Sequence, residues 1–275
     1  MKYTSFAANT FTSIENAPFS PHDYSRLKFG SDHVARAFGH ELADAFFAAH
    51  VDALLANHVV VIPSPYNFVE NAATVMTKHF VDRLNELLVE AKGESVEYLT
   101  IQRKVSYIND YGFLSKEKRK GLLDNDRFYV NKEFVRGKLL IFIDDVKITG
   151  THEDKLKEVL ADRKIRNDAM FLYFAEYLGS QAEIEAQLNF SGIQNLDDYC
   201  ALMNEPNHHI IVRPIKFLLS QPVEALKSFL DRVPYEKVKK LYFSALGEGY
   251  YRIPAYQKTF ALVKSVATSS IRNDG

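Results

Sequence analysis

The sequence has a single cysteine, no long apolar run and almost no net charge. Because Cys200 is alone, one chain cannot form a disulfide framework or a multi-cysteine zinc site, which fits a reducing, cytoplasmic setting. The first residues lack the apolar core of a secretory signal, and no run of about 18 apolar residues is free of polar interruption. A formal net charge of −1 gives no general attraction to nucleic acid or to an anionic membrane. We therefore expect a soluble protein in which any phosphate binding is local.

The sequence does contain enough apolar material for a large core. Its 275 residues, 47% of them hydrophobic, suffice for one large α/β domain with or without an appendage. Apolar residues spaced by four from Val34 to Phe46 predict a helix, with Ser31 and Asp32 as candidate caps. The run 59–62 is β-branched and ends at Pro63, as in strands buried on both faces. The predicted strands are 59–62, 96–101, 139–143 and 170–177, and the predicted helices are 34–55, 70–91 and 154–163.

This alternation of strands and helices favours an α/β fold with a doubly wound, mainly parallel sheet over residues 1–179, in which 1–54 is a helical N-terminal segment. The segment 102–127 contains several basic residues and few apolar positions after Leu114, which predicts a long, basic and mobile connection. Structureless loops of this length are usually functional or disordered. From 180 to 275, three helical stretches at 222–231, 235–246 and 255–266 outweigh one short strand at 209–212. We expect a mainly helical C-terminal appendage.

A pair of acids, Asp144 and Asp145, follows the apolar run 139–143 and precedes Thr149, Gly150 and Thr151. This order predicts a buried strand that ends in two carboxylates and turns into a helix. Backbone N–H groups and the helix dipole at such a junction bind phosphate, Gly150 lets the backbone approach the anion, and the threonines add hydroxyl donors. The carboxylates would repel phosphate but can accept hydrogen bonds from sugar hydroxyls or bind a metal. A phosphate beside a diol indicates a ribose phosphate.

The segment resembles the phosphoribosyl pyrophosphate (PRPP) motif of type I phosphoribosyltransferases. Residues 61–65 lie where that family carries its first pyrophosphate loop, and the basic segment from Arg103 to Arg119 lies where it carries a flexible active-site loop. The order of residues in this basic segment is similar to ComF-like members. The resemblance covers residues 55–178. It implies the type I phosphoribosyltransferase fold, Mg²⁺ with PRPP as the donor, and transfer of ribose 5-phosphate to an acceptor with release of pyrophosphate.

The resemblance also implies roles for individual residues. Asp144, Asp145 and Arg103 are the implied catalytic residues, and the two acids would hold the ribose hydroxyls and, indirectly, Mg²⁺. The implied 5-phosphate site consists of Lys147, Ile148, Thr149, Gly150, Thr151 and His152. The implied pyrophosphate site consists of Ser64, Pro65, Lys104 and Arg119. A hood that recognises the acceptor would come from residues 1–50, including Tyr24, Lys28 and Phe29, and from Tyr250, Tyr251 and Arg252.

Two positions depart from the family's pattern, and they keep a second function open. Ile148 replaces a residue that usually carries a hydroxyl, and His152 stands where a small residue is usual. Both changes suit a non-catalytic PRPP or nucleotide sensor whose helical appendage contacts a partner protein or RNA. A homodimer is open for either function. A haloacid-dehalogenase site would need a second aspartate two positions after Asp144, where Val146 stands.

Three further features have a structural interpretation that outweighs the functional one. His208 and His209 invite a metal site, but adjacent residues of a strand point to opposite faces, which favours structural roles. Cys200 is expected to be a small buried apolar residue. The aromatic stretch from Tyr250 to Tyr256 is expected to serve core packing or a turn between helices, with an acceptor wall as the alternative.

Overall fold

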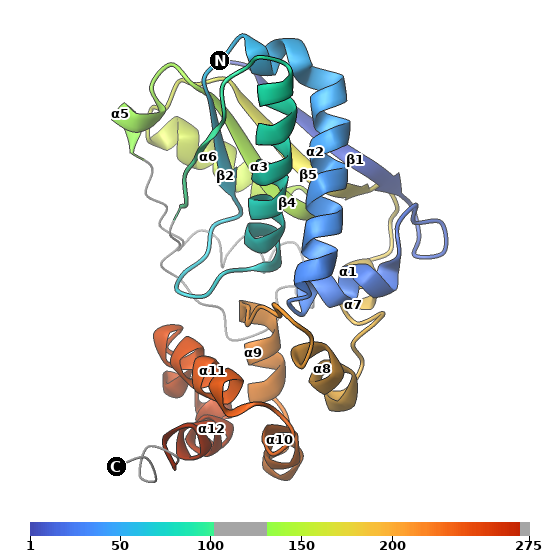
Figure 1. Cartoon of the computed structure of the whole chain (residues 1–275), viewed down its shortest axis with the longest axis vertical. Coiled ribbons are helices and arrows are strands. Elements are labelled where there is room, and N and C mark those ends of the chain that lie inside the picture. The colour runs from blue at the N-terminus through green and yellow to red at the C-terminus, as the bar shows by residue number, and fades with distance from the viewer. Residues whose placement is uncertain (102–130, 270–275) are drawn as a thin grey trace.

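A computed structural model of the chain describes residues 1–101 and 131–269. Within these ranges it has one five-stranded sheet with the strand order β1-β5-β4-β2-β3, in which all neighbours are parallel (Figure 1). The strands are β1 Tyr3–Phe11, β2 Val59–Pro63, β3 Glu97–Tyr98, β4 Leu139–Lys147 and β5 Ala169–Tyr177. The predicted α/β fold with a parallel sheet is confirmed.

Strand β1 was not predicted from the sequence. It lies at the edge of the sheet and pairs along its length with β5, from Tyr3 opposite Ala169 to Phe11 opposite Tyr177. Of its nine residues only Phe11 is fully buried, so the alternation of polar and apolar residues that marks a half-buried strand is weak. The other edge also differs from the prediction: the expected strand 96–101 is only Glu97–Tyr98, since it pairs with just two residues of β2.

Helices cover both faces of the sheet (Figure 1). One face packs against α1 Pro21–Lys28, α2 Asp32–Leu55 and α3 Ala72–Glu90, and the other against α5 Lys132–Val135 and α6 Thr151–Asp162. The predicted cap of α2 is confirmed, because the Ser31 hydroxyl accepts a hydrogen bond from the Val34 N–H. The strands β2, β4 and β5 are therefore buried on both sides, as their continuous apolar runs predicted.

The C-terminal part is helical, as expected. It consists of α7 Ile184–Asn189, α8 Leu196–Met203, α9 Val212–Leu219, α10 Val223–Leu230, α11 Tyr235–Gly247 and α12 Gln257–Ser269, with short 3-10 helices at Tyr250–Arg252 and Pro254–Tyr256. Cys200 is buried in α8, which confirms its expected role as a small apolar residue. The predicted strand 209–212 is wrong: the His209 N–H donates to the Gly30 carbonyl at 2.9 Å, and α9 begins at Val212.

The helices from α8 to α12 have a core of their own and gather beyond the carboxyl ends of the strands (Figure 1). Two residues from the first part of the chain, Phe29 and Val69, belong to that core. Arg26 donates to both carboxylate oxygens of Glu205 at 2.6 and 2.8 Å. The helical part therefore packs tightly on the α/β part, and the division at residue 180 stays a prediction. No helix in the two described ranges is both long and apolar enough to cross a membrane.

His208 contributes to this junction as a buried neutral imidazole. Its Nε2–H donates to the Phe29 carbonyl at 2.9 Å, and its buried Nδ1 has no hydrogen-bond partner among the described residues. An extra proton on Nδ1 would thus be unsatisfied. Burial lowers the pKa of His208 from 6.5 to about 4. The expected structural role of His208 agrees with these contacts.

Acidification should therefore destabilise the protein through His208. His208 binds a proton near pH 6.5 in the unfolded chain but only near pH 4 in the folded chain. Its contribution to the free energy of unfolding is therefore complete above pH 6.5 and is lost as the pH falls from 6.5 to about 4. The free energy of unfolding should lose about 3 kcal/mol from this group. Urea unfolding between pH 7 and 4 should show a shallower pH dependence for His208→Gln, whose amide can donate to the same carbonyl. The exposed His33→Gln is the control, and equal slopes in all three proteins would contradict the assignment.

Candidate active site

The carboxyl end of β2 lies beside the middle of β4, in the interior of the sheet. Pro63 pairs with Ile143, and the next N–H, that of Ser64, donates to the Ile143 carbonyl at 2.8 Å. The helix after β2, α3, packs on one face of the sheet, and the helix after β4, α6, packs on the other. Where the helices after two neighbouring strands leave to opposite faces, α/β proteins bind ligands in a crevice beyond the strands. Here that crevice is a pocket whose lining includes Ser64, Asp144 and His152.

Asp144 and Asp145 lie inside β4 and not after it. The pairing with β5 continues from Asp144 opposite Tyr173 to Lys147 opposite Glu176, so the predicted strand 139–143 was too short. Adjacent residues of a strand point to opposite faces. The contacts agree, because Asp144 meets α6 and Asp145 meets α1. The two carboxylates therefore have separate surroundings.

Asp145 forms a buried ion pair with Lys28, which lies in the last turn of α1. The side chains are only 7% and 16% exposed, respectively. The other carboxylate oxygen accepts the N–H of Val146 at 2.8 Å. Of the three N-terminal residues expected in an acceptor hood, Lys28 thus reaches the site, whereas Tyr24 and Phe29 are buried in the two cores. The pairing of Lys28 with Asp145 was not predicted from the sequence.

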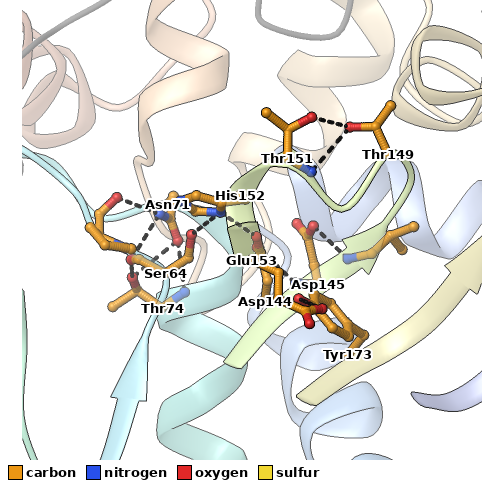
Figure 2. A network of polar contacts seen from close by, with 12 residues as sticks. Ser64, Asn71, Thr74, Asp144, Asp145, Thr149, Thr151, His152, Glu153 and Tyr173 are labelled. Carbon is orange, nitrogen blue, oxygen red and sulfur yellow. Dashed lines mark hydrogen bonds and ion pairs between the residues drawn. The ribbon is translucent and has the colours of Figure 1, made fainter. Parts of the chain in front are cut away.

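Asp144 is linked to the end of β2 through His152 (Figure 2). The His152 Nδ1 lies 2.8 Å from an Asp144 carboxylate oxygen and 3.5 Å from the Ser64 hydroxyl. Burial raises the pKa of Asp144, but the hydrogen bond from His152 and the charges of His152 and Lys28 outweigh it and hold this pKa below the usual value. Asp144 is therefore a carboxylate at neutral pH. The buried Nε2 of His152 has no partner among the described residues.

The turn between β4 and α6 has the form of an anion site. Gly150 is the N-cap residue of α6, adopts a left-handed conformation with φ of 71°, and has no side chain to cap the helix. The hydroxyls of Thr149 and Thr151 lie 2.9 Å apart (Figure 2). The helix begins three residues before the predicted start at 154, because the Gly150 carbonyl already accepts the Asp154 N–H. Uncapped N–H groups at a helix N-terminus bind phosphate.

Behind this turn is a buried cluster of charges. Glu153 is 6% exposed and accepts hydrogen bonds from Lys157 at 2.5 Å and Tyr173 at 3.0 Å. Lys147 lies 3.1 Å from both Glu153 and Glu176. The ammonium group of Lys147 is thus held by two acids. Only the backbone of Lys147 is left for the 5-phosphate site predicted from the sequence. Glu153 and Tyr173 were not singled out from the sequence, where an acid in a first helical turn has the ordinary explanation of the helix dipole.

Comparison with protein families places these elements in a known group. The PRTase ComF-like family matches residues 4–263, which is nearly the whole chain. The chain belongs to this family.

Two solved phosphoribosyltransferase structures are distantly similar to the chain. The chain is similar to a hypoxanthine phosphoribosyltransferase from Staphylococcus aureus, with 8% identity over 53% of this chain and 77% of that one and a TM-score of 0.35. It is also similar to the hypoxanthine phosphoribosyltransferase of Trypanosoma cruzi, with 14% identity over 68% of this chain and 91% of that one and a TM-score of 0.38. Comparison with curated proteins found no match. The family match confirms the phosphoribosyltransferase resemblance inferred from the sequence, and the five-stranded parallel sheet agrees with the fold expected from it.

Ser64 and Pro65, the expected pyrophosphate residues, begin the loop between β2 and α3. The Ser64 carbonyl accepts hydrogen bonds from the Asn71 amide at 3.1 Å and from the Thr74 hydroxyl at 3.4 Å (Figure 2). Asn71 is also the N-cap of α3, because its side chain accepts the Thr74 N–H at 2.9 Å. The loop is thus closed at its base. Neither Asn71 nor Thr74 was singled out from the sequence.

The remaining predicted residues of this ComF-like protein fall into two groups. Arg103, Lys104 and Arg119 lie outside the described residues. Ile148 packs against the larger core of the sheet, so its side chain is a core contact and not a phosphate ligand. Its expected place in the 5-phosphate site rests on its backbone.

The three residues expected at the acceptor do not form one wall. Tyr250 is fully buried in the helical core, where it packs edge-on against Tyr256 at 5.8 Å. Tyr251 and Arg252 are exposed and lie against each other, with 5.1 Å between the guanidinium and the ring centroid. Core packing is therefore the role that Tyr250 shows, and an acceptor contact by its two neighbours stays a prediction.

Proposed function

We propose that this protein binds PRPP and transfers its ribose 5-phosphate group to an acceptor, with release of pyrophosphate. One observation carries the proposal: the first turn of α6, whose N-cap Gly150 has no side chain, and the carboxylate of Asp144 both line one pocket between β2 and β4. The first can hold the 5-phosphate and the second a ribose hydroxyl. Membership of the PRTase ComF-like family supports the same chemistry.

In this proposal the residues act by position and charge. Nucleophilic attack on the ribose C1 breaks its bond to the pyrophosphate oxygen, the acceptor loses a proton, and the ribose carries positive charge in between. Asp144 and Asp145 would accept hydrogen bonds from the ribose hydroxyls and stabilise this charge. Asp145 can do so only when Lys28 moves away from it or shares it. The backbone at Ser64 would face the pyrophosphate, and Arg103, Lys104 and Arg119 are proposed to neutralise it.

The donor set at the crevice fits Mg²⁺ only in part. Carboxylate oxygens are suitable ligands, but in the described ranges no group of three or more acidic, histidine or cysteine side chains is placed to hold a metal ion. Asp144 and Asp145 would therefore hold the ion indirectly, through the ribose hydroxyls or water. When bound, Mg²⁺ would neutralise charge on the pyrophosphate.

A sensor that binds PRPP without turnover is the second candidate. Two observations favour it: Asp145 is occupied by Lys28, and Ile148 is a core residue in a loop that usually offers a hydroxyl. A signal could reach the helical part through α1, because the same α1 segment contacts Glu205 and His208.

Calorimetric titration with PRPP and Mg²⁺, followed by an assay of pyrophosphate release, tests both candidates. We expect one PRPP to bind per chain and pyrophosphate to appear when a suitable base or small metabolite is present. Ribose 5-phosphate alone should bind more weakly, because it makes only part of the contacts. Binding without release over a broad acceptor panel would favour the sensor. A chain that binds neither PRPP nor ribose 5-phosphate would contradict both candidates.

A further inference from the structure

A buried glutamate in the helical part holds the loop that follows β2. Glu248 is the C-cap residue of α11 and is only 6% exposed. One of its carboxylate oxygens accepts the backbone N–H groups of Phe68 and Val69 at 2.9 and 2.7 Å. The other accepts the side-chain amide of Asn67 at 3.2 Å. Three consecutive residues of the loop are thus bound by one side chain about 180 positions away.

The carboxylate lies where a helix alone would disfavour it. The C-terminus of a helix carries partial negative charge, so an acid at this position is destabilising unless donors surround it. At Glu248 the donors come from the loop, and backbone N–H groups that bond to a charged acceptor are among the stronger hydrogen bonds in proteins. The position of Glu248 is therefore explained by the loop and not by α11.

Neighbouring contacts fix the same stretch. A Cβ atom at Gly247 would lie 2.1 Å from the ring of Phe68, so the absence of a side chain there lets the loop approach the helix. Val69 is buried in the helical core, and the Val212 N–H donates to the Glu70 carbonyl at 3.1 Å. The middle of the loop therefore belongs structurally to the helical part.

The two ends of the loop belong to the sheet. At one end the Ser64 N–H donates to the Ile143 carbonyl, and at the other Asn71 caps α3 and returns to the Ser64 carbonyl. Only a few residues separate these ends from the stretch that Glu248 holds. A displacement at Phe68 and Val69 would therefore be passed on to the backbone at Ser64 and Pro65.

We propose that Glu248 is a positioning residue for the pyrophosphate half of the donor. It shapes the loop 64–71 from the helical side, so that the backbone at Ser64 is set for a diphosphate before the ligand arrives. This inference rests on the proposed function, because it takes the loop to be the pyrophosphate site. The helical part then shapes the pyrophosphate site directly, in addition to any contact with an acceptor.

Separate titrations with Mg-pyrophosphate and with ribose 5-phosphate test the proposal in the full chain. Glu248→Ala should weaken pyrophosphate binding about 10-fold, which corresponds to about 1.4 kcal/mol, and leave ribose 5-phosphate binding unchanged. Glu248→Gln should restore part of this loss, because its amide oxygen can still accept from Phe68 and Val69 while its NH₂ group opposes the Asn67 donor. The exposed Glu224→Gln in α10 should behave like the wild type.

Hydrogen exchange gives a readout that does not need a ligand. The amides of Phe68 and Val69 should exchange several-fold faster in Glu248→Gln than in the wild type, while those of β4 stay unchanged. Should Glu248→Ala fail to fold, the glutamine variant carries the test. Equal pyrophosphate affinities in the wild type and the glutamine variant, with PRPP still bound, would overturn this inference alone. A wild-type chain that binds no PRPP would overturn the proposed function and this inference with it.

Discussion

Asp144→Asn should abolish pyrophosphate release from PRPP and leave the fold intact. The substitution removes a negative charge beside the ribose, where the transition state develops positive charge, and losses of this kind reduce turnover by about 100-fold or more. The asparagine oxygen can still accept the hydrogen bond from His152, which lies 2.8 Å away. Steady-state pyrophosphate release and urea unfolding, measured on the same preparation, check the two halves of this expectation.

The exposed Asp154→Asn is the matched control for Asp144→Asn, because it removes one charge from the same end of α6 without touching the crevice. It should cost at most a few tenths of a kcal/mol of stability through the helix dipole and leave turnover unchanged. A fully active Asp144→Asn would remove this carboxylate from the mechanism. If PRPP binds as tightly to the variant as to the wild type but turnover is lost, the charge acts mainly in the transition state.

The parts of the site that are local in the chain were predictable from the sequence. The acids at 144 and 145, the glycine turn and the helix after it follow one another within about a dozen residues, and each has a signal of its own. The side-chain partners of the acids are different. Lys28 is 117 positions from Asp145, and no periodicity in one sequence connects them. His152 is only eight positions from Asp144, but the sequence pointed to it as a residue of the phosphate site and not as a partner of Asp144.

The predictions for residues 209–212 and for β1 failed for one physical reason, which is that local sequence patterns there favour more than one structure. Ile210, Ile211 and Val212 are β-branched and suggest a strand, but α9 starts at Val212 and carries Pro214 in its first turn, which hides the helical signal. Strand β1 was missed because an edge strand with one neighbour needs few buried residues. In both cases the tertiary surroundings decided between local tendencies that the sequence leaves nearly balanced.

The buried ion pair between Lys28 and Asp145 should be the site where a single substitution costs the most stability. Asp145→Asn leaves the Lys28 ammonium without its counter-charge. Lys28→Met leaves the Asp145 carboxylate buried without a counter-charge. Removing one partner of a buried pair costs about 3–5 kcal/mol. The double variant Lys28→Met with Asp145→Asn should recover most of this loss, because no uncompensated charge remains. Urea unfolding of the four proteins gives the coupling free energy directly.

The exposed pair between Lys78 and Glu70, 2.6 Å apart, is the control for this cycle. Lys78→Met should cost less than about 1 kcal/mol, since solvent screens the exposed charges. A coupling between Lys28 and Asp145 no larger than that of an exposed pair would show that the two side chains do not hold each other.

A large coupling has a consequence for binding. PRPP must then compete with Lys28 for Asp145, and Lys28→Met should bind PRPP more tightly than the wild type in calorimetry, with the double variant binding more weakly than Lys28→Met.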